Sequence, residues 1–294
     1  MIKVLNQIWF VLLFIGIVVG PNSQATTVVD TVYINSGSMM AVDSTFMPYF
    51  SFNSSSVFDR ENKRLILSTG DTMMLTVINT DSISHGFDIK HYSNVETVIP
   101  GLNTVEITFS FDSPGAYIYY DYTNAESYRY MGLAGMIIAE NIGSTATSFF
   151  WNIKDHQKTY NETLAQGLSV DWALYYPEYF TINGNSNPHI NDDANARVVG
   201  LVGDTIHIYM VNTGQSLHSL HYHGYHSEIF FSSKFPNHVG RIKDTFSIYS
   251  MEAVMVELIP HQPGEYPVHD HNLVAVSGGN IYPNGMFVTM LIDQ

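Results

Sequence analysis

An internal duplication constrains the fold of this chain more than any other feature of its sequence. Segment 70–85 carries Gly-Asp-Thr, then Asn-Thr, then His, and segment 203–218 repeats these residues at the same spacing. Segment 114–122 is matched by 263–271, and a Gly-Met pair opens an apolar run in each copy, at 135–138 and 285–288. The first match has an offset of 133 and the second of 149, so the second copy holds about 16 extra residues in between. Matches that keep their order predict two copies of one domain.

Each copy has the composition of β structure. Short segments rich in Val, Ile, Thr, Tyr and Phe alternate with Gly, Asn, Asp and Pro, which is typical of sandwiches and barrels. The expected strands are Thr27–Ile34, Met73–Asn79, Val105–Phe111, Met136–Glu140, Ile206–Asn212, Thr245–Tyr249, Val254–Ile259 and Met286–Ile292. The one helical candidate is Lys158–Gln166. We therefore predict an all-β chain of two tandem Greek-key β-sandwich domains, at 26–141 and 148–294.

The first 25 residues have the pattern of a secretory signal peptide. Lys3 precedes an apolar run from Ile8 to Gly20, and Ser23-Gln24-Ala25 supplies the small residues of a cleavage site. The run is too short for an ordinary membrane span. Cleavage after Ala25 would give a secreted or periplasmic protein without a membrane span, and an uncleaved anchor is the alternative.

Charge and cysteine content exclude several functions. The chain has 12 Lys and Arg against 27 Asp and Glu, a net charge of −15, which argues against nucleic acid as a partner. It contains no Cys. Disulfides, thiolate nucleophiles, zinc–thiolate sites, iron–sulfur clusters and blue-copper thiolates are thus excluded.

Two groups of histidines in the second copy indicate a metal site. Residues i and i+2 of a strand point to the same face. His221 and His223 should therefore project together, as should His269 and His271. If the two segments are neighbours, four imidazoles converge, and imidazole suits copper, zinc, iron and nickel. The alternatives are a solvated face and a wet, hydrogen-bonded cleft.

These motifs resemble those of a two-domain multicopper oxidase built from cupredoxin domains. His218-x-x-His221-x-His223-Gly224 is similar to the family's HxxHxHG element, and His269-x-His271 to its HCHxxxH element. The resemblance implies copper, with His221 serving a type 2 ion and His223, His269 and His271 a type 3 pair. It also implies a blue-copper position for His218 and a near-axial position for Met286.

The departures from the family pattern lie at the blue-copper site and in the first copy. Asp270 stands where the family has its blue-copper Cys, and Ala275 where it has a second His. In the first copy Asp88, Lys90, Tyr120 and Tyr122 align with the four histidines. The expected cofactor is therefore one or two copper ions per chain, not a complete four-copper set. His85, Asp270 and Met286 are weak ligands or structural residues, and we align Met136 of the first copy with Met286.

Two functions remain open from the sequence. One is an extracytoplasmic copper protein with residual oxidoreductase activity, whose copper would meet dioxygen or a small reducing substrate directly. The other is a non-catalytic cupredoxin module for copper carriage, sensing or structural interaction.

The sequence supports three further hypotheses, two about the metal site and one about glycosylation of the surface. Two-domain relatives commonly form trimers, so His85 or His91 of one chain could complete the cluster of another. His221, His223 and Glu228 also match part of a cupin metal motif. Asn53 and Asn161 each begin a glycosylation sequon.

Overall fold

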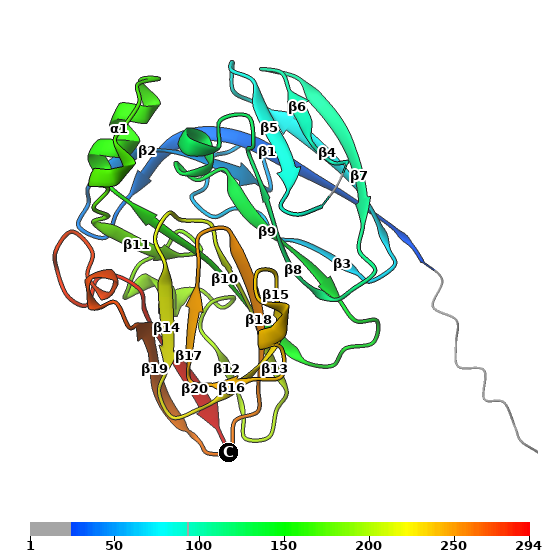
Figure 1. Cartoon of the computed structure of the whole chain (residues 1–294), viewed down its shortest axis with the longest axis vertical. Coiled ribbons are helices and arrows are strands. Elements are labelled where there is room, and N and C mark those ends of the chain that lie inside the picture. Colours follow the sequence, from blue (N-terminus) through cyan, green and yellow to red (C-terminus); the bar gives the residue numbers. More distant parts are fainter. Residues whose placement is uncertain (1–24, 93) are drawn as a thin grey trace, which may run out of the picture.

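The computed structural model describes residues 25–92 and 94–294, and it consists of four β-sheets packed as two sandwiches (Figure 1). The signal-peptide prediction for residues 1–25 therefore lies almost wholly outside the described residues. None of the helices in the described chain is both long and apolar enough to cross a membrane.

The first sandwich is built from strands β1 to β9. One sheet has the order β2-β1-β4-β7 and the other β3-β9-β8-β5-β6. The strands are β1 (Thr27–Met40), β2 (Phe46–Asn53), β3 (Leu65–Ser68), β4 (Thr72–Asn79), β5 (His85–Ile89), β6 (Thr97–Ile99), β7 (Thr104–Ser110), β8 (Gly115–Tyr120) and β9 (Ala134–Glu140), with the short helix η1 (Ala125–Arg129) before β9.

The second sandwich repeats this topology. Its sheets have the orders β11-β10-β13-β18-β15-β16 and β12-β20-β19-β14-β17. The strands are β10 (Thr147–His156), β11 (Tyr179–Ile182), β12 (Val199–Leu201), β13 (Ile206–Asn212), β14 (His218–Tyr222), β15 (Ser227–Ser232), β16 (Ile242–Lys243), β17 (Thr245–Ile248), β18 (Glu252–Leu258), β19 (Gly264–Asp270) and β20 (Phe287–Asp293). The helices are α1 (Lys158–Ala165), η2 (Trp172–Leu174), η3 (His189–Asp192), η4 (Pro236–His238) and η5 (Leu273–Val276).

The duplication seen in the sequence is a duplication of structure. β1 pairs with β2 antiparallel and β4 parallel, and β10 pairs with β11 and β13 in the same way. Asn79 donates to the carbonyls of Ile83 and Ile99, and its counterpart Asn212 donates to those of Ser216 and Ile248. The extra residues of the second copy form the β15–β16 hairpin between β14 and β17. The predicted all-β fold of two cupredoxin-like sandwiches is confirmed, and α1 begins where the helix was expected.

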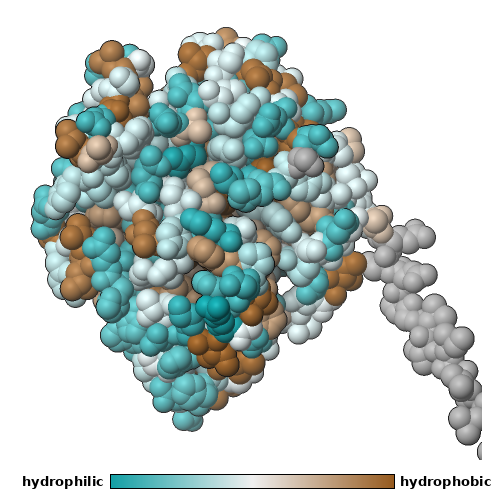
Figure 2. All heavy atoms as spheres, in the orientation of Figure 1, coloured by the Kyte–Doolittle hydropathy of each residue, from teal (hydrophilic) through white to brown (hydrophobic). Residues whose placement is uncertain are grey.

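The two sandwiches are joined by a face of β8 and β9. Apolar side chains on this face pack against β10, β13 and β18 of the second sandwich; they are Ala116, Ile118, Met136 and Ile138 against Phe150, Tyr209, Val211 and Met255. Lys154, fully buried, donates to the carbonyl of Ala134 across the junction at 2.8 Å. Figure 2 shows hydrophilic and hydrophobic side chains interspersed over one outer face, with no large continuous apolar area.

Candidate metal centre

Neighbouring strands bring the two histidine groups of the second sandwich together. β14 and β19 are antiparallel partners, and His221 lies directly opposite His269. The even-numbered residues Leu220, Tyr222 and Val268 point into the core, so the odd-numbered histidines point outward. His223 and His271 follow on the same face, because each lies two residues from a paired histidine.

The four rings form one compact cluster. The ring centroid of His221 lies 4.8 Å from that of His223, 5.8 Å from that of His269 and 5.6 Å from that of His271. The closest atoms are Nε2 of His223 and Nε2 of His269, 3.1 Å apart. His221 and His269 are half-buried and His223 and His271 are exposed, so the cluster is open to solvent.

A main-chain carbonyl determines the tautomer of His269. Its Nδ1 lies 2.9 Å from the carbonyl oxygen of Asp270. A carbonyl can only accept a hydrogen bond, so Nδ1 of His269 must carry the proton. In the neutral ring Nε2 then presents its lone pair to the cluster. Such an outer hydrogen bond also fixes the ring orientation of metal-binding histidines.

A hydroxyl relay does the same for His221. Thr245 donates its hydroxyl proton to Oδ1 of Asp244 at 3.0 Å. The Thr245 oxygen therefore accepts from Nδ1 of His221, which lies 3.0 Å away. In the neutral ring, Nε2 of His221 is thereby left with a lone pair. The Thr245 bond contributes most to holding the pKa of Asp244 below its usual value, which keeps this carboxylate charged at the end of the relay.

This donor set fits a metal ion that prefers imidazole. Imidazole nitrogens bind zinc at about 2.0–2.1 Å, so a separation of 3.1 Å suits two ligands of one such ion. Burial, followed by the charges of His221 and His269, lowers the pKa of His223, which favours the neutral, ligand-competent ring. Across residues 25–92 and 94–294, no three His, Asp or Glu side chains are already arranged around one ion. A third histidine would therefore have to rotate toward the His223–His269 pair, and the exposed ring of His271 has room to do so.

His218 does not belong to this cluster, contrary to its placement among the metal ligands. It lies three residues before His221 and points into the domain, where it is fully buried. Its Nδ1 contacts Oδ2 of Asp270 at 2.6 Å, and its Nε2 lies 4.0 Å from Oδ1 of Asp155. Burial alone would lower the pKa of His218, but the two carboxylates of Asp155 and Asp270 outweigh it and raise the pKa to about 9. The ring lies between two carboxylates, and the raised pKa favours its protonated form.

The first sandwich holds the same arrangement. Nδ1 of His85 contacts Oδ2 of Asp121 at 2.9 Å, and Nε2 lies 3.9 Å from Oδ2 of Asp81. Asp121 also accepts from the backbone N–H groups of Gly86 and Thr123, as Asp270 accepts from those of Ser219 and Asn272. Both copies thus hold a buried His–Asp pair whose carboxylate is saturated, at the position that the family resemblance assigns to a blue-copper site.

The alignment of the two methionines is wrong. The β8–β9 ladder pairs Tyr120 with Ala134, and the β19–β20 ladder pairs His269 with Phe287. This register places Leu133 opposite Met286, and the carbonyls of these two residues accept from Asp121 and Asp270 respectively. Met286 packs in the core beside Ala275, and neither side chain is exposed.

The positions of His85 and Glu228 in the fold correct two other expectations about metal ligands. His85 is fully buried, so it cannot reach a cluster on another chain. Glu228 lies on β15, which belongs to the sheet opposite β14, and the cupin reading of His221, His223 and Glu228 is therefore wrong.

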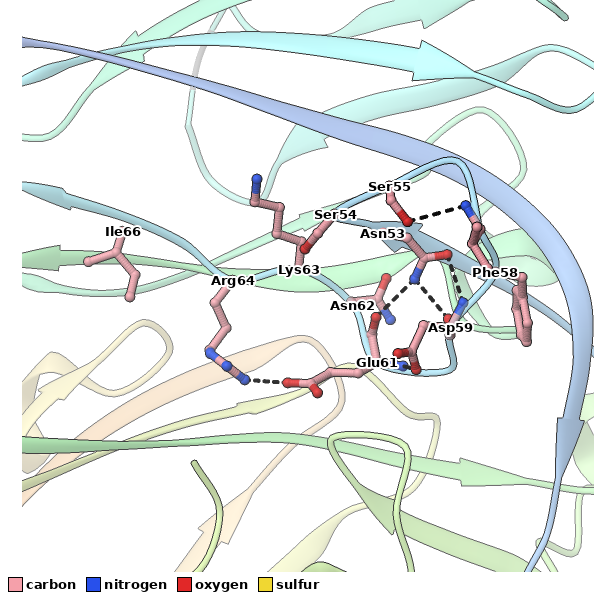
Figure 3. A pocket seen from close by; sticks show the side chains of 11 residues that line it. Asn53, Ser54, Ser55, Phe58, Asp59, Glu61, Asn62, Lys63, Arg64 and Ile66 are labelled. Atoms are coloured by element: carbon pink, nitrogen blue, oxygen red, sulfur yellow. Dashed lines mark hydrogen bonds and ion pairs between the residues drawn. The ribbon is translucent and has the colours of Figure 1, made fainter. Parts of the chain in front are cut away.

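Neither sequon asparagine is accessible in the fold. Asn53 is 2% exposed, and its amide donates to Ser51 and to the carbonyls of Asp59 and Glu61 (Figure 3). Asn161 is fully buried and donates to the carbonyl of Pro48. A glycan on either nitrogen would have to replace these bonds.

Three residues of these sites were missed by sequence reasoning. Asp155 lies on β10, more than 60 residues before His218, and only the sandwich brings them together. Thr245 falls in a predicted strand, but nothing in the sequence indicates that β17 would lie beside β14. Asp244 contacts only Thr245 in this relay, so its role becomes visible only once the contact between Thr245 and His221 is known.

The sequence and the fold were compared with those of known proteins. Residues 159–293 match a family model described as multicopper oxidase. No curated protein matches the chain. Among solved structures, the chain is similar to a blue copper oxidase from Nitrosomonas europaea at 20% identity, with a TM-score of 0.76 over 91% of this chain and 86% of that one.

Two further solved structures share this architecture. The copper nitrite reductase from Nitrosomonas europaea is 19% identical, with a TM-score of 0.71 over 90% of this chain and 94% of that one. The multicopper oxidase mgLAC is 17% identical, with a TM-score of 0.77 over 92% and 87%. At these identities the likeness concerns the fold.

Proposed function

We propose, from the match of residues 159–293 to the multicopper oxidase family model, that the outer face of β14 and β19 binds copper. The ligands are His223 and His269, completed by His221 and His271. The observation that carries the proposal is the pair of Nε2 atoms 3.1 Å apart, with the tautomer of His269 fixed by the carbonyl of Asp270. Copper is favoured among the metals that imidazole binds because of the match to the multicopper oxidase family model and because its affinity is the highest in the divalent series.

The redox role that we propose for this site depends on its exposure to solvent and on the absence of a blue-copper site beside it. Copper bound there would supply one-electron chemistry with dioxygen or a small reducing substrate. The exposed rings of His223 and His271 leave the face open, so a substrate can approach without a channel. The relay from Asp244 through Thr245 holds the ring of His221 and, in the neutral ring, leaves Nε2 with a lone pair. The buried pair of His218 and Asp270 offers no blue-copper relay. We therefore propose an extracytoplasmic copper-dependent oxidoreductase in which substrate meets the histidine face directly.

Copper carriage is the second candidate, and the openness of the face favours it. A site with two exposed ligands can exchange its ion with a partner or a chelator more readily than a buried one.

The test is copper binding by the mature protein, measured by metal analysis and electron paramagnetic resonance. We expect one or two ions per chain, and we expect the double variant His223→Ala/His269→Ala to lose them. His261→Ala is the matched control, since it removes an exposed histidine of the same domain outside the cluster. Full copper loading of the double variant would refute the assignment. Oxygen consumption with phenols or cuprous ion that scales with copper content separates the oxidoreductase from the carrier.

A further inference from the structure

A cavity of about 370 Å³ lies where the two domains meet, away from the histidine face. One wall comes from the end of β1 and the turn after it, with Met39, Met40 and Val42. The other comes from β11 and the turn after it, including Thr181. The volume falls within the range of small-molecule sites and would hold about a dozen waters.

Thr181, one of the residues that line this cavity, carries an unpaired hydroxyl. The side chain of Thr181 is 3% exposed, and its Oγ1 has no hydrogen-bond partner within the described chain. Buried polar groups are normally paired, and leaving one unpaired is destabilising. Two other polar side chains of the lining are paired: Ser186 donates to the carbonyl of Phe180, and Tyr179 donates to Asp43. Ser44, which is exposed, and His189, which contacts Asp192 at 3.4 Å, also line the cavity. Thr181 is therefore free to donate to whatever occupies the cavity.

A cation without a carboxylate partner lines the same space. Arg60 is half-buried, its stem lies against Gly184, and one guanidinium nitrogen donates to the side-chain oxygen of Asn185. In the described part of the chain, no carboxylate lies within ion-pair distance of Arg60, whereas the nearby Lys63 and Arg64 pair with Asp30 and Glu61. Among the described residues no Asp or Glu lines the cavity, although acidic residues outnumber basic ones by 27 to 12 in the sequence. The carboxylate behind its wall, Asp43, accepts from Tyr179.

The neighbouring pocket of about 430 Å³ provides a contrast (Figure 3). Its polar side chains are paired within the pocket: the amide of Asn53 donates to the main-chain carbonyls of Asp59 and Glu61, and Arg64 contacts the carboxylate of Glu61. None of the buried side-chain atoms that lack a partner belongs to the residues lining it, within the described chain. That pocket is internally satisfied and does not point to a ligand.

We propose that the cavity at the domain junction binds a small organic carboxylate. The carboxylate contacts the guanidinium of Arg60 and the hydroxyl of Thr181, and the apolar part of the ligand lies against Met39, Met40 and Val42. A planar guanidinium with spare N–H donors matches a carboxylate in geometry and charge. The apolar wall favours an organic acid over an inorganic anion. Because the ligand contacts both domains, its binding stabilises their docking.

The test is calorimetric titration of the mature protein with benzoate, with benzamide as a neutral isostere and inorganic phosphate as a non-organic anion. We expect benzoate to bind at least about tenfold more tightly than either, from the value of a charge-assisted hydrogen bond. Arg60→Gln should weaken benzoate binding by about tenfold or more. Arg241→Gln is the matched control: it removes the same charge from an exposed arginine outside the cavity and should leave affinity unchanged.

Thr181→Val keeps the proposal testable if the arginine variant folds poorly. It removes only the unpaired hydroxyl, and it should weaken benzoate binding several-fold while the protein stays folded. Three results would overturn the proposal: equal binding of benzoate and benzamide, phosphate binding as tight as benzoate binding, or no saturable benzoate binding below about 10 mM. The last result would mean that water fills the cavity.

Discussion

Replacing Asp270 by asparagine tests whether His218 is an imidazolium held between two carboxylates. His218, Asp155 and Asp270 are all fully buried, and the His218–Asp270 contact is 2.6 Å long. A buried imidazole without charged partners would be neutral, because burial disfavours its protonated form. The pKa of about 9 therefore depends on the two carboxylates.

The size of the effect follows from the pKa of His218 in the folded and unfolded chains. The folded value of about 9 lies above the ordinary value of 6.5. At about 1.4 kcal/mol per pKa unit, this difference contributes about 3 kcal/mol to the free energy of unfolding. Because the folded pKa is the higher one, the contribution is complete below pH 6.5 and is lost as the pH rises through 9. The Asp270→Asn variant should lose about 3 kcal/mol below pH 6.5 and show a weaker decline above it.

Urea unfolding followed by tryptophan fluorescence measures both quantities, since Trp151 is fully buried in the core of the second domain. The wild type should lose about 3 kcal/mol of unfolding free energy between about pH 6 and pH 9.5, and Asp270→Asn clearly less. Glu96→Gln, which removes an exposed carboxylate, should follow the wild type. A wild-type unfolding free energy that is flat across this range would refute the imidazolium.

Three further outcomes are expected. Thr245→Val breaks the relay to His221 and should lower copper affinity by about tenfold, measured by competition with a chelator. Ser247→Ala, on the same strand face, is the control and should leave the affinity unchanged. Equal copper affinities of Thr245→Val and the wild type would contradict the relay. Burial lowers the pKa of His156 to about 4, so the folded state loses stability as the pH falls from 6.5 toward 4. His156→Phe, which keeps the aromatic contacts with Tyr49 and Tyr130, should reduce that loss of unfolding free energy, measured by urea titration. A variant that loses as much stability as the wild type between pH 6.5 and pH 4 would contradict the assignment to His156. Protein secreted from a eukaryotic host should show no mass change on glycosidase treatment, because Asn53 and Asn161 are buried; a glycan on either would contradict their placement.

Local register explains where sequence comparison of the two copies succeeded and failed. The Gly-Asp-Thr and Pro-Gly segments align correctly because they lie on continuous strands and tight turns, as the shared bonding of Asn79 and Asn212 shows. The Gly-Met pairs align by eye but not in space, because the ladder of β19 and β20 is shifted by three residues relative to that of β8 and β9. Backbone hydrogen bonds and core packing determine this register, and a dipeptide match does not report on them.

The sequence by itself determined the two-domain β fold, the shared outward face of His221 with His223 and of His269 with His271, and the absence of a thiolate. Duplication, alternation and composition are all local properties of a chain, and the alternation of side chains along a strand fixes which neighbours share a face. The tertiary structure decided that β14 lies beside β19, so that the two histidine pairs form one cluster. It also placed Thr245 against His221 and Asp155 against His218, and it put Arg60 and Thr181 in the lining of one cavity. These pairings cross between strands or domains, and they depend on how sheets pack around a core, which no local pattern specifies.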